Sequence, residues 1–97
     1  MSEIRIEKID TDQRKALGIP DAPRTLNGWS VWECPPSKFD WQYADAEMAY
    51  VYEGKVKVKA GQMEVEIKKG DFVTFPKGLS CSWQVIEKIR KVYKFTT

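Results

Sequence analysis

Apolar and polar residues alternate along most of the chain from Trp29 onward, and this alternation limits the fold more than any other feature. A period of two is typical of half-buried β-strands, in which successive side chains point to opposite faces. The alternating segments are WSVWE (29–33), FDWQY (39–43), KVKVK (55–59), MEVEI (63–67) and RKVYKF (90–95). Seven or eight short strands at this spacing favour a β-sandwich or small barrel over a fold with crossover helices.

Turn residues separate the predicted strands. Ala60-Gly61-Gln62 predicts a hairpin between two of them, and Lys69-Gly70-Asp71 predicts the next turn. The one expected helix, from Thr11 to Leu17, is a turn or two long because Gly18 and Pro20 follow it. The Pro-, Gly- and Asn-rich residues 18–28 indicate an irregular connection.

Length and charge indicate an ordinary soluble domain. The 97 residues predict a single domain over 1–97, and a net charge of +2 argues against nucleic acid as the partner. No run of apolar residues is long enough for a membrane span, and the N-terminus is charged, so we expect no membrane association and a cytoplasmic location. Cys34 and Cys81 are expected to be free thiols.

The chain contains no histidine, and this excludes several kinds of site. Serine and cysteine nucleophiles activated by histidine, zinc deaminase sites and facial iron triads all need an imidazole. Phosphate-binding glycine loops are absent from the sequence as well. A thiol could still react if a nearby cation lowered its pKa, but the sequence indicates no such partner.

A spaced set of turn residues nevertheless suggests a family. Gly70 is followed by Pro76, Gly78 and Cys81 at intervals that resemble the second motif of the cupin superfamily, where a histidine stands at the last position. Pro76 and Gly78 suit a rigid corner before the strand LSCSWQV (79–85), whose Cys81, Trp83 and Val85 share one face.

The first cupin motif is also recognisable. Glu47, six further residues and Gly54 resemble its end, and counting back places Trp41 and Tyr43 where that motif has two histidines. The motifs lie within 41–54 and 70–81. The sequence most resembles the small single-domain cupins grouped with (S)-ureidoglycine aminohydrolase and the ethanolamine-utilisation cupin. The resemblance implies an all-β fold, a small jelly-roll-like cupin barrel with a short N-terminal helical turn.

The resemblance also implies a site inside the barrel. The family's metal-ligand positions are occupied here by Trp41, Tyr43, Glu47 and Cys81, and exchanging two imidazoles for an indole and a phenol makes a poor divalent-metal site. We therefore predict no cofactor. If a metal binds, Tyr43, Glu47 and Cys81 are its ligands.

Three functions stay open. The first is binding of a small polar molecule, without the usual metal, in a pocket lined by Phe39, Trp41, Tyr43, Glu47, Cys81 and Trp83. The second is an isomerase, lyase or amide hydrolase with Glu47 as general acid or base and Tyr43 as proton donor or oxyanion stabiliser. The third, disfavoured by the low charge, is a β-barrel that binds single-stranded nucleic acid.

Structural roles compete with these functional ones. Trp41 and Tyr43 can fill the barrel, and Cys81 can be a small buried hydrophobe. An inward Glu47 needs a partner, which the sequence leaves open between the Tyr43 hydroxyl, a lysine and a water. The resemblance implies a homodimer, and Tyr50 and Tyr52, on the face opposite Glu47, are expected to be exposed for that contact.

Overall fold

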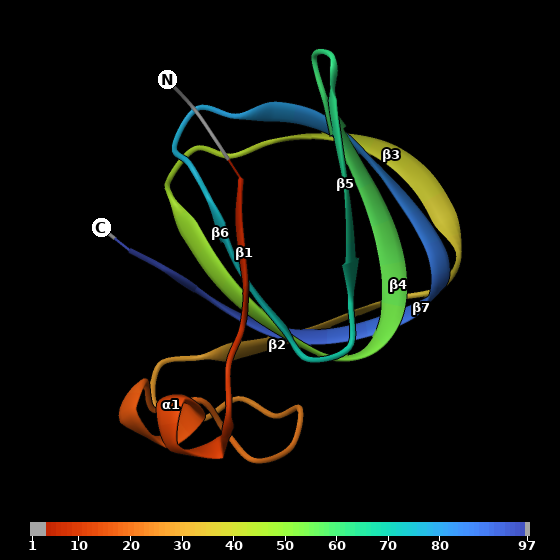
Figure 1. Cartoon of the computed structure of the whole chain (residues 1–97). Helices are drawn as coiled ribbons and strands as arrows, with labels where there is room; N and C mark the ends of the chain where they lie inside the picture. The colour runs from red at the N-terminus through yellow and green to blue at the C-terminus, as the bar shows by residue number, and fades with distance from the viewer. Residues whose placement is uncertain (1–3, 97) are drawn as a thin grey trace.

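The computed structural model describes residues 4–96, and within this range the chain forms one short helix and seven strands (Figure 1). The elements are β1 (Arg5–Lys8), α1 (Thr11–Ala16), β2 (Ser30–Cys34), β3 (Ser37–Gln42), β4 (Glu47–Ala60), β5 (Met63–Lys68), β6 (Asp71–Phe75) and β7 (Ser80–Phe95). All the paired strands are antiparallel. The predicted all-β class is confirmed, and the sheet curls into a small barrel (Figure 1).

Two long, curved strands, β4 and β7, organise the barrel (Figure 1). The first residues of β4 pair with β6 and its second half pairs with β5, while β7 pairs with β3 through its first half and with β2 through its second. β4 and β7 also pair with each other along most of their length. The sheet therefore curls over, and the side chains on its concave face make the main core.

The bend in β4 depends on a glycine. The register between β4 and β7 shifts at three steps between Val51 and Val56, which marks β-bulges. Gly54 lies among these shifts with φ of 96°, and a Cβ atom there would lie 2.2 Å from the carbonyl oxygen of Lys88. Only glycine allows the backbones of β4 and β7 to approach this closely.

Seven strands agree with the predicted seven or eight, but β4 and β7 are longer than the alternation suggested. KVKVK (55–59) is the second half of β4, and RKVYKF (90–95) is the end of β7 rather than a separate strand. The chain bends at bulges and stays extended, so one strand serves two parts of the sheet. The helix over 11–16 and the hairpin turn between Ala60 and Met63 agree with the prediction.

The N-terminal segment adds features that the alternation did not predict. β1 pairs with β6, and α1 begins with a capping box in which Asp10 and Gln13 exchange side-chain hydrogen bonds with each other's backbone N–H groups. The following residues 18–28 have no strand or helix, as expected, apart from one isolated bridge between Leu26 and Trp29.

This segment covers a second, smaller core, and here one expectation was wrong. Tyr50 is buried rather than exposed, because it packs with Ile19, Trp29, Phe72 and Val92 on the outer face of the sheet. Tyr52 is half-buried, and its hydroxyl donates a hydrogen bond to the carbonyl oxygen of Pro20. The face that we expected to be free for a dimer contact is thus largely occupied by the chain's own N-terminal residues.

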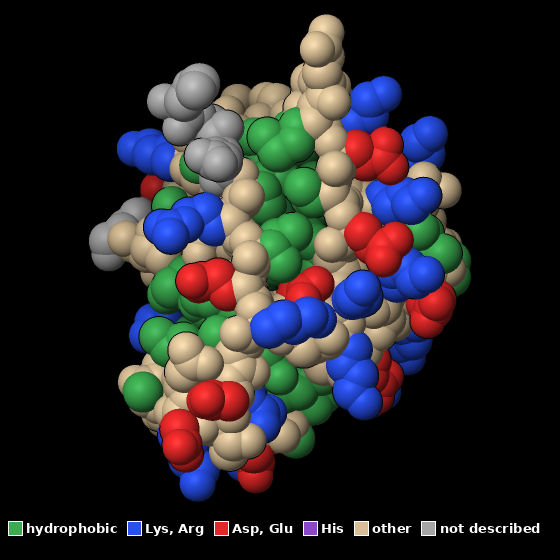
Figure 2. All heavy atoms as spheres, viewed as in Figure 1, with side chains coloured by type: hydrophobic (Ala, Val, Ile, Leu, Met, Phe, Trp, Pro, Cys, Tyr) green, Lys and Arg blue, Asp and Glu red, His purple; other side chains and the backbone are tan. Residues whose placement is uncertain are grey.

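The outer surface is mixed. Figure 2 shows hydrophobic side chains in the space between β1 and β5, with lysine, arginine, aspartate and glutamate side chains gathered beside β5. Pairing explains this opening, since β6 pairs with β1 and β4, whereas β5 pairs with β4 alone. Within residues 4–96 there is no helix of the length and hydropathy needed to cross a bilayer.

Candidate functional site

A cavity of about 380 Å³ opens into the main core. Its walls come from β2, β3, β4, β7 and the residue after β3, and they are mainly aromatic. The lining residues are Trp32, Phe39, Trp41, Tyr43, Glu47, Trp83, Lys91, Tyr93 and Phe95. Glu47 and Lys91 are the two charged residues in this set.

These two residues form a buried ion pair. Lys91 Nζ donates a hydrogen bond of 3.1 Å to Glu47 Oε2, and the side chains are only 7% and 8% exposed. Glu47 is the first residue of β4, and Lys91 is in the half of β7 that pairs with it. Of the three partners that the sequence left open for Glu47, the structure shows a lysine. Losing either member would leave an uncompensated charge in the core.

Aromatic rings surround the ammonium group. Lys91 Nζ lies 4.8 Å from the ring centroid of Trp83, 5.0 Å from Trp32, 5.7 Å from Tyr93 and 5.8 Å from Phe75. Ring faces attract a cation when it is within about 6 Å, so these contacts offset part of the lost hydration. The amine is held in one place by a carboxylate and by several rings.

The environment changes how the polar groups of the cavity ionise. Burial lowers the pKa of Lys91, and the negative charge and hydrogen bond of Glu47 oppose this shift. Burial, reinforced by Glu47 and then by Cys81, raises the pKa of Tyr43 far above its usual value. Tyr43 therefore keeps its hydroxyl proton even in alkaline solution, so its hydroxyl can donate a hydrogen bond to a bound ligand.

Two polar groups of the cavity wall remain available to a ligand. Glu47 Oε2 accepts from Lys91, whereas no group in residues 4–96 donates a hydrogen bond to Glu47 Oε1. Tyr43 likewise makes no side-chain hydrogen bond of good geometry within that range. The Trp83 indole N–H lies close enough to oppose the rise in the Tyr43 pKa, but this buried N–H has no hydrogen-bond partner in the described chain.

Stacked aromatic rings form the buried part of the cavity wall, and two further aromatic residues at its edge are exposed to solvent. The Tyr43 and Phe75 rings stack with centroids 4.6 Å apart, and Phe39 stacks on Trp83 at 6.0 Å. Trp41 and Phe95 line the same cavity but are 54% and 50% exposed. Trp41 therefore does not fill the barrel, as a purely structural role would require, and instead stands at the mouth of the cavity.

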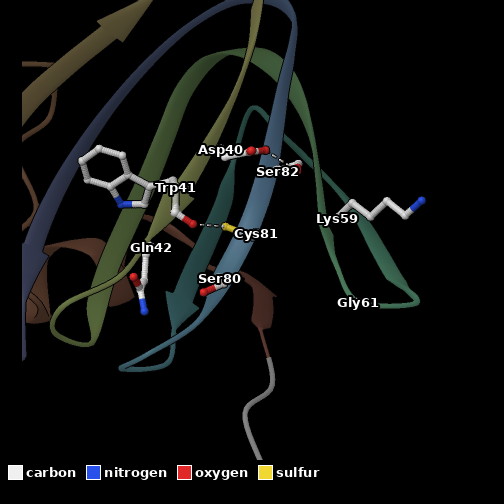
Figure 3. A pocket seen from close by; sticks show the side chains of 8 residues that line it. All are labelled: Asp40, Trp41, Gln42, Lys59, Gly61, Ser80, Cys81 and Ser82. Carbon is white, nitrogen blue, oxygen red and sulfur yellow. Dashed lines mark hydrogen bonds between the residues drawn. The ribbon is translucent and has the colours of Figure 1, made fainter.

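Cys81 is the one predicted site residue that does not line the cavity. The other five do, whereas Cys81 lines a shallow groove of about 620 Å³ between β3 and the end of β4, which Trp41 also borders (Figure 3). Its thiol donates a 3.6 Å hydrogen bond to the Trp41 carbonyl oxygen, and burial raises its pKa. In Figure 3 the Trp41 indole and the Lys59 side chain point away from the thiol. Both cysteines are free, as expected.

The donor set does not fit a divalent metal. Trp41, Tyr43, Glu47 and Cys81 stand at the positions for which the sequence resemblance implied metal ligands. Here Glu47 is bonded to a lysine, Tyr43 is held in its protonated form, and Cys81 faces the groove. Across residues 4–96, histidine, cysteine, aspartate and glutamate form no cluster of three or more suited to a metal ion.

Sequence reasoning missed four lining residues, which are Trp32, Lys91, Tyr93 and Phe95. For three of these a signal existed. Trp83, Val85 and Ile89 are buried at odd-numbered positions of β7, and the same alternation continues to Lys91, Tyr93 and Phe95. The alternation alone predicts RKVYKF (90–95) as a separate strand, so it does not show that Lys91, Tyr93 and Phe95 lie on the same face of one strand as Trp83.

Comparison with known proteins confirms the predicted small cupin barrel. The family model of the EutQ-like cupin domain matches residues 23–93. The chain therefore belongs to the EutQ-like cupin family.

Solved structures extend this result. The chain is 41% identical to a DUF861 family protein from Thermotoga maritima, with a TM-score of 0.85 over 97% of this chain and 100% of that one. The EutQ protein of Clostridium difficile is 21% identical over 95% of this chain and 66% of its own, with a TM-score of 0.62. A cupin-2 domain protein from Shewanella frigidimarina is 18% identical over 91% and 94% of the two chains, with a TM-score of 0.60. The last two likenesses show the fold alone. No curated protein matches the chain.

Proposed function

We propose that the protein binds a small, uncharged polar molecule in the aromatic cavity, without the metal that cupins commonly use. The observation that carries this proposal is the buried Glu47–Lys91 pair in the cavity wall. Buried charges are costly to desolvate, and an ion pair at the wall of an open cavity is more than packing requires.

The size and chemistry of the cavity define the ligand. Pockets for small molecules have volumes of roughly 300–1,000 Å³ and apolar walls with a few polar groups, and this cavity of about 380 Å³ is at the small end. The charges of Glu47 and Lys91 compensate each other, which favours a neutral ligand. Such a ligand would donate to Glu47 Oε1, accept from the Tyr43 hydroxyl and place its apolar part against Trp41 and Phe95.

A second candidate is catalysis at the same site. A carboxylate paired with a lysine can exchange a proton with a bound substrate, and the raised pKa of Tyr43 keeps its hydroxyl as a donor. Glu47 as general acid or base and Tyr43 as oxyanion stabiliser would suit an isomerase, lyase or amide hydrolase. Turnover that is lost in Glu47→Gln would favour this candidate over binding alone.

The test is a ligand-detected NMR screen of small neutral amides, alcohols and carbonyl compounds in the presence of EDTA. We expect hits that bind without metal and lose about tenfold in affinity in Tyr43→Phe, which removes one hydrogen bond. Glu66→Gln, on the exposed part of β5, is the matched control and should bind normally. Hits that need a divalent metal, or that bind Tyr43→Phe as well as wild type, would contradict the proposal.

The predicted homodimer and cytoplasmic location stay part of the proposal. With Tyr50 covered, other exposed apolar residues, among them Val31, Met63 and Ile86, offer surface for self-association. Light scattering during gel filtration is the direct measurement, and a monomer at high micromolar concentration would remove the dimer from the account.

A further inference from the structure

Building on the proposed cavity site, we propose that Lys91 is a nucleophile that forms an imine with a small aldehyde or ketone bound in the cavity. A binding site for neutral molecules does not need a lysine in its wall. The position, partner and surroundings of Lys91 each fit this further role.

The position of the amine is suited to attack on a ligand. Lys91 lines the cavity, although its side chain is only 7% exposed, so the cavity is the route by which a small molecule can reach Nζ. Within residues 4–96, its one hydrogen-bond partner is Glu47. Its other near neighbours are ring faces, which hold the amine in place without blocking its nitrogen by further hydrogen bonds.

Burial favours the reactive, neutral form of the amine, whereas the charge and hydrogen bond of Glu47 favour the ammonium until the carboxylate accepts its proton. A lysine nucleophile must be neutral, and desolvation in an apolar pocket is a known means of activating it. Burial lowers the pKa of Lys91 here, and the Glu47 carboxylate 3.1 Å away is placed to accept the proton. Lysines on the outer face of the sheet, such as Lys57, are exposed to solvent.

The step balances with the groups present. Lys91 transfers a proton to Glu47, and the free nitrogen attacks the carbonyl carbon, forming a C–N bond as the carbonyl π electrons move to oxygen. After proton transfer from nitrogen to this oxygen, Glu47 returns its proton to the carbinol hydroxyl, and the C–O bond breaks to release water. The products are one water and a protonated imine, whose positive charge replaces that of the ammonium beside the Glu47 carboxylate.

The cavity also indicates which carbonyl compounds can react. The Tyr43 hydroxyl is a donor for the carbonyl oxygen, and the rings of Trp41, Tyr93 and Phe95 can pack against an apolar substituent. A charged substituent would upset the balance of the ion pair. We therefore expect neutral aliphatic or aromatic aldehydes and small ketones to react, and keto acids to react poorly.

The experiment is reductive trapping on the full chain. Wild-type protein is incubated with limiting butanal or benzaldehyde, reduced with borohydride, and mapped by peptide mass spectrometry. We expect Lys91 to be labelled at least about tenfold faster than Lys57, because a bound carbonyl has a high effective concentration at the amine. The label at Lys91 should saturate with aldehyde concentration, and Lys57→Arg should not change it.

The outcomes separate this inference from the proposed function. Lys91→Arg, which keeps the charge but cannot form the imine, should lose the saturable label, and in the wild-type protein the alcohols corresponding to the two aldehydes should compete with that label. If the rate of labelling instead follows the exposure of each lysine, so that Lys91 reacts last, Lys91 is not the proposed nucleophile, even if those alcohols bind in the cavity. If neither alcohols nor aldehydes bind, the cavity proposal fails for these compounds and the imine fails with it.

Discussion

At the residue scale, the Glu47–Lys91 pair distinguishes this cavity from an ordinary aromatic core. Glu47 could be predicted as an inward carboxylate from the first cupin-like motif, and its need for a partner followed from the cost of burial. Lys91 could not be identified as that partner from the sequence, because it lies 44 residues from Glu47 along the chain and belongs to no motif. Only the pairing of β4 with β7 brings the two side chains together.

The pair predicts strong coupling between two substitutions. Lys91→Met should destabilise the protein by about 3–5 kcal/mol because it leaves the Glu47 carboxylate buried without a partner. Glu47→Gln leaves the ammonium in the same position. The double variant has no buried charge, so its loss of stability in urea unfolding should be well below the sum of the single losses. Additive losses would show that the two side chains do not form a pair in solution.

Tyr43 predicts a particular pH dependence of stability. Because its pKa is raised in the folded state, the folded protein keeps this proton above pH about 10, where an unfolded tyrosine releases it. At this group the folded state then binds more protons than the unfolded state, so the contribution of Tyr43 to the free energy of unfolding falls as the pH rises through this range. The lowered pKa of Lys91 acts in the opposite direction.

Tyr43→Phe should reduce that slope, as measured by urea unfolding at several pH values between about 9 and 11. It should leave other contributions in the same direction, since burial also raises the pKa of Tyr52 to about 12 and raises the pKa of Cys81. An unchanged slope in Tyr43→Phe would mean that the hydroxyl is not buried as described.

At the element scale, the cavity exists because β4 and β7 bend together. The strand segments and the hairpin at Gly61 could be predicted from alternation and turn residues. The bends could not, because a bulge does not interrupt the apolar pattern strongly enough to be seen in sequence. The same bends carry β7 from its pairing with β3 to its pairing with β2, and so place Trp83 and Lys91 in one wall.

Two glycines test this account of the bend. Gly54→Ala should destabilise the protein by several kcal/mol, because the added Cβ would lie 2.2 Å from the Lys88 carbonyl oxygen at a φ of 96°. Gly61→Ala, at the hairpin turn, has a φ of 61° but meets nothing within 4 Å, and should cost about 1 kcal/mol. Thermal unfolding of both variants is the measurement, and equal losses would contradict the close approach of β4 and β7.

At the scale of the whole molecule, the N-terminal segment closes the outer face of the sheet. The motif spacing predicted a barrel with an interior site, and the helix was expected from its capping and stop residues. That residues 18–28 and Trp29 would cover Tyr50 could not be predicted, because this packing joins an irregular segment to strands far along the chain.

Substituting two tryptophans compares how much the covered outer face and the cavity mouth each contribute to stability. Trp29 is 1% exposed and fills the second core, so Trp29→Ala should cost about 3–5 kcal/mol of stability. Trp41→Ala removes a side chain that is mostly in solvent and should cost less than about 1 kcal/mol. The free energy of urea unfolding gives both values. Similar losses would show that the N-terminal segment does not pack on the sheet in solution.

The central claim is that an ion pair and aromatic rings replace the metal in this cupin cavity. The most direct measurement is elemental analysis of protein purified without a histidine tag or chelator, before and after dialysis against manganese, iron, nickel and zinc. The account predicts metal well below one ion per chain in wild type, Glu47→Gln and Cys81→Ser alike. One tightly held ion per chain that is lost in Glu47→Gln would contradict the account and make Glu47 a metal ligand.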